Sequence, residues 1–463
     1  MSRTISPHNR FLTASPGRIF VATAMPMVVI MVMNGFLGII DAFFLGHFVG
    51  AQAMAAVGVA FPVLMLLIAL STLVSGGMSS LLARQLGAGD RAGAGNTFAG
   101  AHGLALAIAL ILTLIFACCG WQFSLGVAGD NLPLAHRVWT FLAIMIFATP
   151  IQFWLGLHGD AWRNEGKAGP MALLSLGVTL FNIVLNYIFV GLLGLGVAGS
   201  AMGTVIAQAL GLLLLAALRP FIGGMLPLAV LWRSRWTANW RSILALGAPV
   251  SLSFIGIALS AACVIASLRM HGGDDYAGQV AAYGVVTRIF GFAFLPIMAI
   301  ALAMQSIVGN NVGARLLARS DAVLRIAALT ALFYCLAVEL LLIGAGSGLG
   351  AAFGDDPFVI DLIAHMLGTM SLLYLFTGPV LVLGLYFQAI GQPARAALLT
   401  LVKPLFLLPA FIIGAAALRG VAAVWFAYPL ADGMAAMVAA LVLAGVLKAR
   451  HAPGLGLKTG VAP

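Results

Sequence analysis

The sequence has few charged residues: Asp, Glu, Lys and Arg together make up 8% of 463 positions, whereas hydrophobic residues make up 62%. Soluble globular domains carry about 25% charged residues, so a water-soluble globular chain is excluded. Apolar runs of roughly 20 residues recur along the whole length, and each is long enough to cross a bilayer as a helix. The sequence therefore predicts an all-α membrane protein in contact with the lipid bilayer.

Cysteine and catalytic motifs are also scarce. The four cysteines lie within or at the ends of apolar runs and lack metal-ligand spacing; they are Cys118, Cys119, Cys263 and Cys335. We expect them to act as small buried hydrophobic residues. The chain contains no His-Glu-x-x-His, no Gly-x-Ser-x-Gly and no phosphate loop ending in Gly-Lys-Ser/Thr. We therefore predict that the protein is not an enzyme and has no cofactor.

The apolar runs predict twelve membrane spans. Their approximate ranges are 19–45, 52–80, 94–117, 134–159, 170–191, 197–218, 243–268, 279–308, 323–345, 358–388, 396–416 and 421–447.

The basic residues indicate how these spans are oriented. With the N-terminus in the cytoplasm, all 23 Lys and Arg residues except Arg137, Arg269, Arg288 and Arg419 lie in or beside cytoplasmic segments. This is the positive-inside distribution. The net charge of +10 is therefore a topology signal and does not indicate a nucleic-acid partner. We predict a multi-pass protein of the inner membrane with both termini in the cytoplasm.

The spanning pattern occurs twice. Residues 55–89 align without a gap with residues 281–315, and further matches continue toward the C-terminus at nearly the same offset. Matching pairs include Ala55/Ala281, Gly58/Gly284, Met78/Met304, Gly87/Gly313, Gly166/Gly391 and Gly196/Gly420. Such a repeat indicates two homologous halves, as in many secondary transporters.

The repeat predicts the architecture. Six spans per half is an even number, so the halves should be related by an axis along the membrane normal. We expect two pseudo-symmetric six-helix bundles, residues 1–218 and 243–463, facing each other across a V-shaped central cavity. Residues 219–242 are rich in Trp and Arg and are predicted to form a cytoplasmic interfacial linker.

Polar residues within the first half suggest an ion site. Asp41 lies in the first span, and an acid inside the membrane is by default a functional hypothesis. Asn182 and Asn186 in the fifth span are spaced i,i+4 and share one face, as do Ser200 and Thr204 in the sixth. All five lie at a similar depth, and their oxygens could hold Na⁺ or surround a carboxylate that takes up a proton.

Other polar residues of the spans are less clearly grouped. Glu339 and Asp432 are intramembrane acids that could be functional or structural. Arg288 is expected either to pair with an acid such as Asp432 or to line a cavity, and Lys403 is expected to snorkel to the cytoplasmic interface. Pro26 interrupts the helix that carries Asp41 and is predicted to act as a hinge.

Several fragments, in this order and spacing, resemble the multidrug and toxic compound extrusion (MATE) family across essentially the whole chain. They are Asp41–Gly46 (DAFFLG), Leu82–Asp90 (LARQLGAGD), Arg163–Lys167 (RNEGK), Asn182–Phe189 (NIVLNYIF), Gly196–Thr204 (GVAGSAMGT), Ala281–Arg288 (AAYGVVTR) and Gly309–Ala314 (GNNVGA).

The resemblance implies cation-coupled export of organic compounds that are lipophilic and often cationic. In that family an acid on the first helix, two polar residues on the fifth and a Thr on the sixth form the ion site; here Asp41, Asn182, Asn186 and Thr204 stand at those positions. Some members have an acid where Asn186 stands. One branch also carries acids in the seventh and tenth helices; this chain shows none at those positions, and Pro379 stands at about the tenth-helix position.

We therefore expect an antiporter, a monomer in the membrane, that uses H⁺ or Na⁺ to export lipophilic cationic compounds by alternating access. If Na⁺ is the coupling ion, its ligands are expected to come from the four residues of the ion site. Two alternatives stay open at this point. A flippase of lipid-linked oligosaccharide or another lipid precursor could share the architecture, and an embedded enzyme would need a catalytic set that the sequence does not display.

Overall fold

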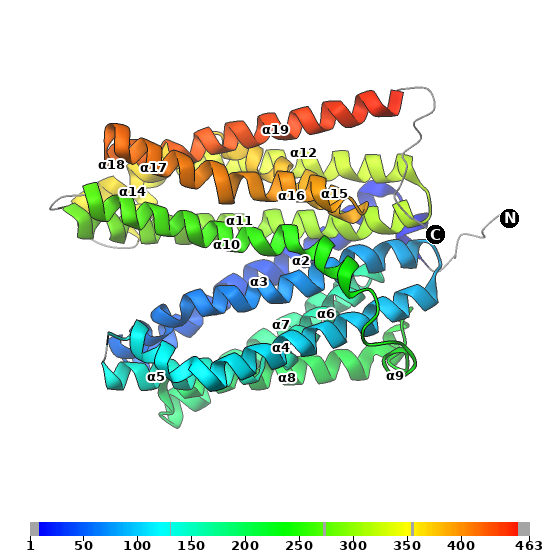
Figure 1. The fold of residues 1–463 in the computed structure, drawn as a ribbon, viewed down its shortest axis with the longest axis horizontal. Coiled ribbons are helices and arrows are strands. Elements are labelled where there is room, and N and C mark those ends of the chain that lie inside the picture. The colour runs from blue at the N-terminus through cyan, green and yellow to red at the C-terminus, as the bar shows by residue number, and fades with distance from the viewer. Residues whose placement is uncertain (1–8, 130, 272–274, 353–355, 452–463) are drawn as a thin grey trace. The chain divides into compact units, whose positions relative to one another are not determined.

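A computed structural model describes residues 9–129, 131–271, 275–352 and 356–451, and every regular element in these ranges is helical. The helices and single turns are α1 (Arg10–Thr13), α2 (Pro16–Phe48), α3 (Ala51–Gly87), α4 (Arg91–Val127), α5 (Leu132–Phe147), α6 (Thr149–Asn164), α7 (Ala168–Asn186), η1 (Tyr187–Leu192), α8 (Gly196–Ile222), α9 (Val230–Arg233), α10 (Trp240–His271), α11 (Tyr276–Gly313), α12 (Leu317–Gly344), α13 (Gly346–Ala351), α14 (Pro357–Met370), η3 (Tyr374–Phe376), α15 (Thr377–Ala389), α16 (Pro393–Leu401), η4 (Val402–Leu407), α17 (Leu408–Arg419), α18 (Val421–Val424) and α19 (Ala427–His451). Figure 1 shows them as long helices joined by short connections.

Twelve membrane spans follow from these elements, as predicted. Ten helices of the described residues are long and apolar enough to cross a bilayer, and two bent pairs supply the remaining spans. The pairs are Leu132–Phe147 with Thr149–Asn164, bent by 46°, and Pro357–Met370 with Tyr374–Ala389, bent by 54°. The all-α membrane fold is therefore confirmed, although two spans predicted as continuous segments are broken in the middle.

Large apolar side chains are exposed along the spans. On α4, Leu110, Ile111, Leu114 and Ile115 are each more than half exposed. In water such a surface would drive aggregation, but in a bilayer it contacts acyl chains. The exposed apolar surface is therefore what a membrane-embedded helix requires.

The chain divides into two compact units. The first runs through Ser251 and includes Gly309–Leu316, and the second comprises Leu252–Val308 and the chain from Leu317 onward. The start of α10 and the end of α11 thus pack with the first unit, although both helices belong to the second half of the sequence. The predicted boundaries at residues 218 and 242 stay a prediction.

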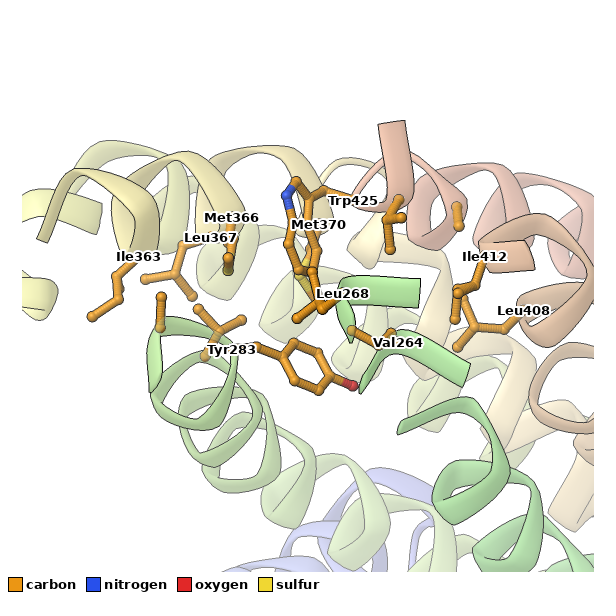
Figure 2. Close-up of a cluster of buried hydrophobic side chains, with 14 of the residues drawn as sticks. Val264, Leu268, Tyr283, Ile363, Met366, Leu367, Met370, Leu408, Ile412 and Trp425 are labelled. Atoms are coloured by element: carbon orange, nitrogen blue, oxygen red, sulfur yellow. The ribbon is translucent and has the colours of Figure 1, made fainter. Parts of the chain in front are cut away.

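Each unit has its own apolar core. One cluster in the first unit gathers side chains of α3, α5 and α8 around Leu67, Leu142 and Ala201. In the second unit, side chains from α10, α11, α14 and α17 surround Tyr283, whose ring stacks on Trp425 with centroids 6.0 Å apart (Figure 2). Both cores are built from side chains that face one another across small residues, as is usual for membrane helices.

The linker segment packs closely on α4. The indole Nε1 of Trp240 donates to the carbonyl of Gly100 at 2.8 Å, and the Asn239 amide donates to Oγ1 of Thr97 at 2.8 Å. Gly100 also leaves no room for a side chain beside the backbone of Ala238. The segment predicted as an interfacial linker is therefore partly docked on the first bundle, while Trp232 is 87% exposed.

Two glycines matched by the repeat have the same backbone conformation. Gly166 follows α6 with φ 77° and Gly391 follows α15 with φ 82°. Side chains other than glycine rarely adopt this left-handed region. Both residues therefore mark the same helix–helix turn in each half, which explains why glycine stands at both positions.

The ends of α3 and α11 cross at another repeated pair of glycines. A Cβ added to Gly87 would fall on the backbone carbonyl of Asn310, and one added to Gly313 would fall on that of Arg84. Arg84 and Asn310 are themselves aligned by the repeat, so the contact is reciprocal. The Asn310 side chain also accepts from Asn9 at 2.9 Å and donates to the carbonyl of Asn164 at 3.2 Å.

We predict that Gly313→Ala lowers the free energy of unfolding by about 1–3 kcal/mol, because the new methyl group would overlap backbone atoms of α3. Gly38→Ala in α2 is the matched control, since nothing lies within 4 Å of its added Cβ. Thermal unfolding of the purified protein in detergent measures both. Equal unfolding temperatures for the two variants would show that the close crossing of α3 and α11 contributes no stability.

Candidate functional site

The polar residues predicted from the first half come from three neighbouring helices. Asp41 lies seven residues before the end of α2, which corresponds to about 10 Å at 1.5 Å per residue. Asn186 is the last residue of α7, and Thr204 lies in the third turn of α8. The depths match because α2, α7 and α8 pack side by side in the first unit.

The structure brings Asp41, Asn182, Asn186 and Thr204 into one hydrogen-bonded cluster, which we call the Asp41 cluster. Asn186 Nδ2 donates to Asp41 Oδ1 at 2.5 Å and lies 3.3 Å from Asn182 Oδ1. Asn182 Nδ2 donates to Thr204 Oγ1 at 3.3 Å. A continuous chain of polar contacts therefore links α2 through α7 to α8.

Ser200 contributes through its backbone. The hydroxyl of Thr204 donates to the carbonyl of Ser200 at 3.1 Å, which leaves the hydroxyl oxygen to accept from Asn182. The Ser200 side chain is buried and forms none of the contacts that join the cluster. Its expected role as an additional cavity residue stays a prediction.

One oxygen in the cluster has no hydrogen-bond partner. Asn186 is fully buried, yet its Oδ1 is unpaired among the described residues. Gly203 of α8 lies against this oxygen, and a Cβ at that position would come within 2.5 Å of it. An unpaired buried acceptor is unfavourable, so this oxygen is available to a donor or a cation.

Asp41 differs electrostatically from Asp160, Glu165 and Asp432, each of which forms an ion pair. It forms no ion pair within the described part of the chain, and its partner is a neutral amide. The donor set around it consists of carboxylate, amide and hydroxyl oxygens, which suits Na⁺ or a proton on the carboxylate. The cluster can therefore bind a single positive charge without first displacing one of its own.

Two local features next to the cluster were not predicted. The backbone changes to a π-helix, η1, directly after Asn186, and such segments are frequent at functional sites. An aromatic group includes the first residue of η1: the rings of Phe44, Phe48 and Tyr187 have centroids 5.9–6.5 Å apart. The phenylalanines that follow Asp41 in the sequence were a signal for an aromatic group near this acid. Sequence spacing alone does not show that Tyr187 belongs to the group.

Pro26 lies inside α2, as predicted, and the helix continues through it without a break in assignment. It is fifteen residues before Asp41, about 22 Å along the same helix. A proline at an interior position removes one backbone hydrogen bond and favours a kink. Its role as a hinge stays a prediction.

Glu339 supports the broken tenth span. Its two carboxylate oxygens accept from the backbone N–H groups of Leu373 at 3.1 Å and Leu375 at 2.8 Å. These amides lie at the break between α14 and α15, where Leu373 has a φ of 65°. The acid thus satisfies donors that an interrupted helix would otherwise leave unpaired in the membrane.

Asp432 forms an ion pair with Lys403 and accepts from Thr377 Oγ1 at 2.8 Å. Arg288 does not pair with Asp432: it is exposed and forms no ion pair among the residues described, so its alternative role in lining a cavity stays a prediction. The expectation that Lys403 snorkels to the interface was wrong, because its ammonium group is paired with Asp432.

A charged group at one end of the first bundle was also missed. Glu165 forms a buried ion pair with Arg219, and it accepts from the backbone N–H of Met225 at 3.0 Å. Asp160 pairs with Arg163 at 2.7 Å, and Arg163 donates to Ser79 at 2.9 Å. These arginines were counted only as topology signals. The pairing of Glu165 with Arg219 joins two helices and cannot be seen in the order of residues, whereas the i,i+3 spacing of Asp160 and Arg163 within α6 was an available signal.

Comparison with known proteins agrees with this geometry. The family model described as MatE matches residues 26–188 and again residues 249–413. The chain therefore belongs to the MatE family, whose members are membrane transporters and not enzymes. The double match falls on the two halves predicted from the internal repeat.

Individual relatives cover nearly the whole chain. The FAD transporter of Shewanella oneidensis is 24% identical, and the alignment covers 87% of this chain and 89% of that protein. The multidrug export protein MepA of Staphylococcus saprophyticus is 22% identical over 91% of this chain and 92% of that protein. Both relatives are transporters by name, one of FAD and one of drugs.

Among solved structures, an outward-facing multidrug resistance MATE family transporter of the MOP superfamily has a TM-score of 0.87. It is 23% identical, and the match covers 97% of this chain and 100% of that one. This likeness shows the shared twelve-helix fold.

We predict that Glu339→Ala lowers the free energy of unfolding by about 2–5 kcal/mol, because two backbone N–H groups at the break lose their acceptor. Glu339→Gln should be milder, since its amide oxygen can still accept one of the two bonds. Thermal unfolding in detergent measures both variants. A fully stable alanine variant would mean that the break in the tenth span does not depend on this carboxylate.

Proposed function

We propose that the protein is an antiporter that exports lipophilic, cationic organic compounds and imports H⁺ or Na⁺ at the Asp41 cluster. The observation that supports this most strongly is an intramembrane carboxylate whose hydrogen-bond partner, Asn186, is a neutral amide linked through Asn182 to the Thr204 hydroxyl. Charged residues at such positions mark ion pathways in membrane transporters. We further infer that the protein is a monomer of the inner membrane with cytoplasmic termini; residues 1–8 and 452–463 lie outside the described residues.

Proton uptake would change the hydrogen bonding of the cluster. An ionised Asp41 can only accept, and it accepts from the Asn186 amide. Once protonated it also becomes a donor, and the unpaired Oδ1 of the same amide is a ready acceptor. A rotation of the Asn186 side chain would then exchange one arrangement for the other, and Asn182 would follow because it contacts that side chain.

Sodium would use the same oxygens differently. Four groups supply hard oxygen ligands that suit a small cation: the carboxylate of Asp41, the amide oxygens of Asn182 and Asn186, and the hydroxyl of Thr204. Binding would require the Asn186 Nδ2 group to turn away from Asp41. Because the same oxygens suit both H⁺ and Na⁺, the coupling ion has to be identified by experiment. Efflux at fixed pH is measured with and without sodium.

Either ion must act by differential affinity. It can shift the transporter between access states only to the extent that it binds one state more tightly. A hundredfold preference corresponds to about 2.7 kcal/mol. Desolvation of a largely buried carboxylate is large enough to supply such a difference, and Pro26 gives α2 a point at which it can bend between the two states.

A lipid-linked oligosaccharide flippase is less well supported. Such a substrate would favour a cavity rich in Arg and Lys, whereas the bases that the sequence places well inside the spans are few, Arg288 and Lys403. An embedded enzyme is excluded by the family.

We predict that Asp41→Asn abolishes cation-coupled efflux, with at least a tenfold loss of rate, because the amide cannot change its charge. Dye efflux from inverted membrane vesicles under an imposed ion gradient measures this. Asp361→Asn is the matched control, since Asp361 is an exposed acid in α14. Coupled efflux at the normal rate by the folded Asp41 variant would refute the proposed coupling site.

We predict that Pro26→Ala reduces efflux several-fold while leaving the Asp41 cluster and the fold intact, because α2 regains the missing hydrogen bond and resists bending. Pro16→Ala is the control, since Pro16 is the first residue of α2 and its missing N–H has no intrahelical role. The same vesicle assay compares the two, together with thermal unfolding. Unchanged efflux by Pro26→Ala would remove the hinge from the mechanism.

A further inference from the structure

A second polar site lies in the second unit, formed by Lys403 of η4, Asp432 of α19 and Thr377 at the start of α15. The Lys403 ammonium is paired with Asp432, and its Nζ lies 3.5 Å from Thr377 Oγ1. Thr377 in turn donates to the same carboxylate at 2.8 Å. Three separate helices thus converge on one ammonium group.

This site is deep in the membrane. Lys403 lies ten residues after Pro393, where its span begins, which corresponds to about 15 Å. Asp432 lies eleven residues after Val421, about 16 Å into the next span. Both charges are therefore near the middle of their helices.

Stability alone does not explain why an ion pair is kept there. A buried ion pair is often no more stabilising than apolar residues of similar size, because both charges must be removed from water. Intramembrane charges are instead concentrated where transporters bind substrates or ions. The position of the pair therefore points to binding.

The two charges are not equally covered. The Lys403 side chain is 25% exposed, whereas that of Asp432 is 4% exposed. An ammonium group has three N–H donors, and the two oxygens at this site account for two of them. The more exposed side chain of the pair is that of the cation, whose remaining N–H donor calls for an acceptor, and most favourably an anion.

We propose that Lys403 binds the carboxylate or phosphate group of an acidic cargo molecule, with Asp432 and Thr377 holding the ammonium in position. This rests on the proposed function as a small-molecule exporter and extends its substrates from cationic to acidic compounds. The anion would accept from the third N–H donor of the ammonium group and share its positive charge with Asp432. Asp432 also acts as an internal competitor, which keeps binding weak enough for release.

The test measures binding of fluorescein, an anionic dye, to the full-length protein in nanodiscs by fluorescence anisotropy, without an ion gradient. We expect Lys403→Met to weaken fluorescein binding at least tenfold and Asp432→Asn to strengthen it severalfold, because the competitor is removed. Lys448→Met removes the same charge at an exposed position and should change nothing. Rhodamine 6G, a cationic dye, should bind Lys403→Met no more weakly than it binds the unsubstituted protein.

A double variant keeps the test informative if Lys403→Met alone fails to fold. Lys403→Met combined with Asp432→Asn removes both charges, leaves no unpaired acid, and should still bind fluorescein at least tenfold more weakly. Fluorescein binding by the folded double variant within twofold of the unsubstituted protein, or no binding by the unsubstituted protein itself, would overturn the inference. Neither result bears on Asp41, because the assay contains no coupling gradient and the efflux test of Asp41→Asn is separate.

Discussion

The hydrocarbon core of the bilayer supplies no hydrogen bonds, so every polar group within a span must find its partner inside the protein. Three of the intramembrane acids in the described chain meet this requirement in different ways. Asp41 is hydrogen-bonded to a neutral amide, Glu339 to backbone N–H groups at a helix break, and Asp432 to a lysine. These three arrangements predict three different functions. Asp41 is suited to ion coupling, Glu339 to support of a bent helix, and Asp432 to holding the lysine of a binding site.

The contrast between the acids also distinguishes two halves that share one frame. In the first half the Asp41 carboxylate has no cationic partner, so an incoming cation would interact with its whole negative charge. In the second half Lys403 already neutralises Asp432. The proposed coupling is consequently confined to the first bundle, although the repeated glycines show that the backbone of both bundles follows one plan. Duplication has preserved the turns and helix crossings, and the polar chemistry has diverged.

Much of the fold was predictable because lipid imposes simple rules. The scarcity of charge, the length of the apolar runs and the distribution of Lys and Arg indicated twelve spans. The spacing of Asn182 and Asn186 put both amides on one face, and the depth of Asp41 placed it beside them. The breaks in the fourth and tenth spans were not predictable, because an apolar run has the same composition whether it is straight or bent.

The sequence by itself thus determined the membrane environment and the number of spans from local composition, and the duplication from its internal repeat. It also indicated the residues of the Asp41 cluster, through their spacing and depth along single helices and through the family resemblance. Only the tertiary structure decided which charges meet. These contacts join different helices: Lys403 pairs with Asp432, Glu165 pairs with Arg219, and Glu339 accepts from the amides of the broken span. Their physical basis is the packing of neighbouring helices, which brings together side chains whose separation in sequence carries no information about distance.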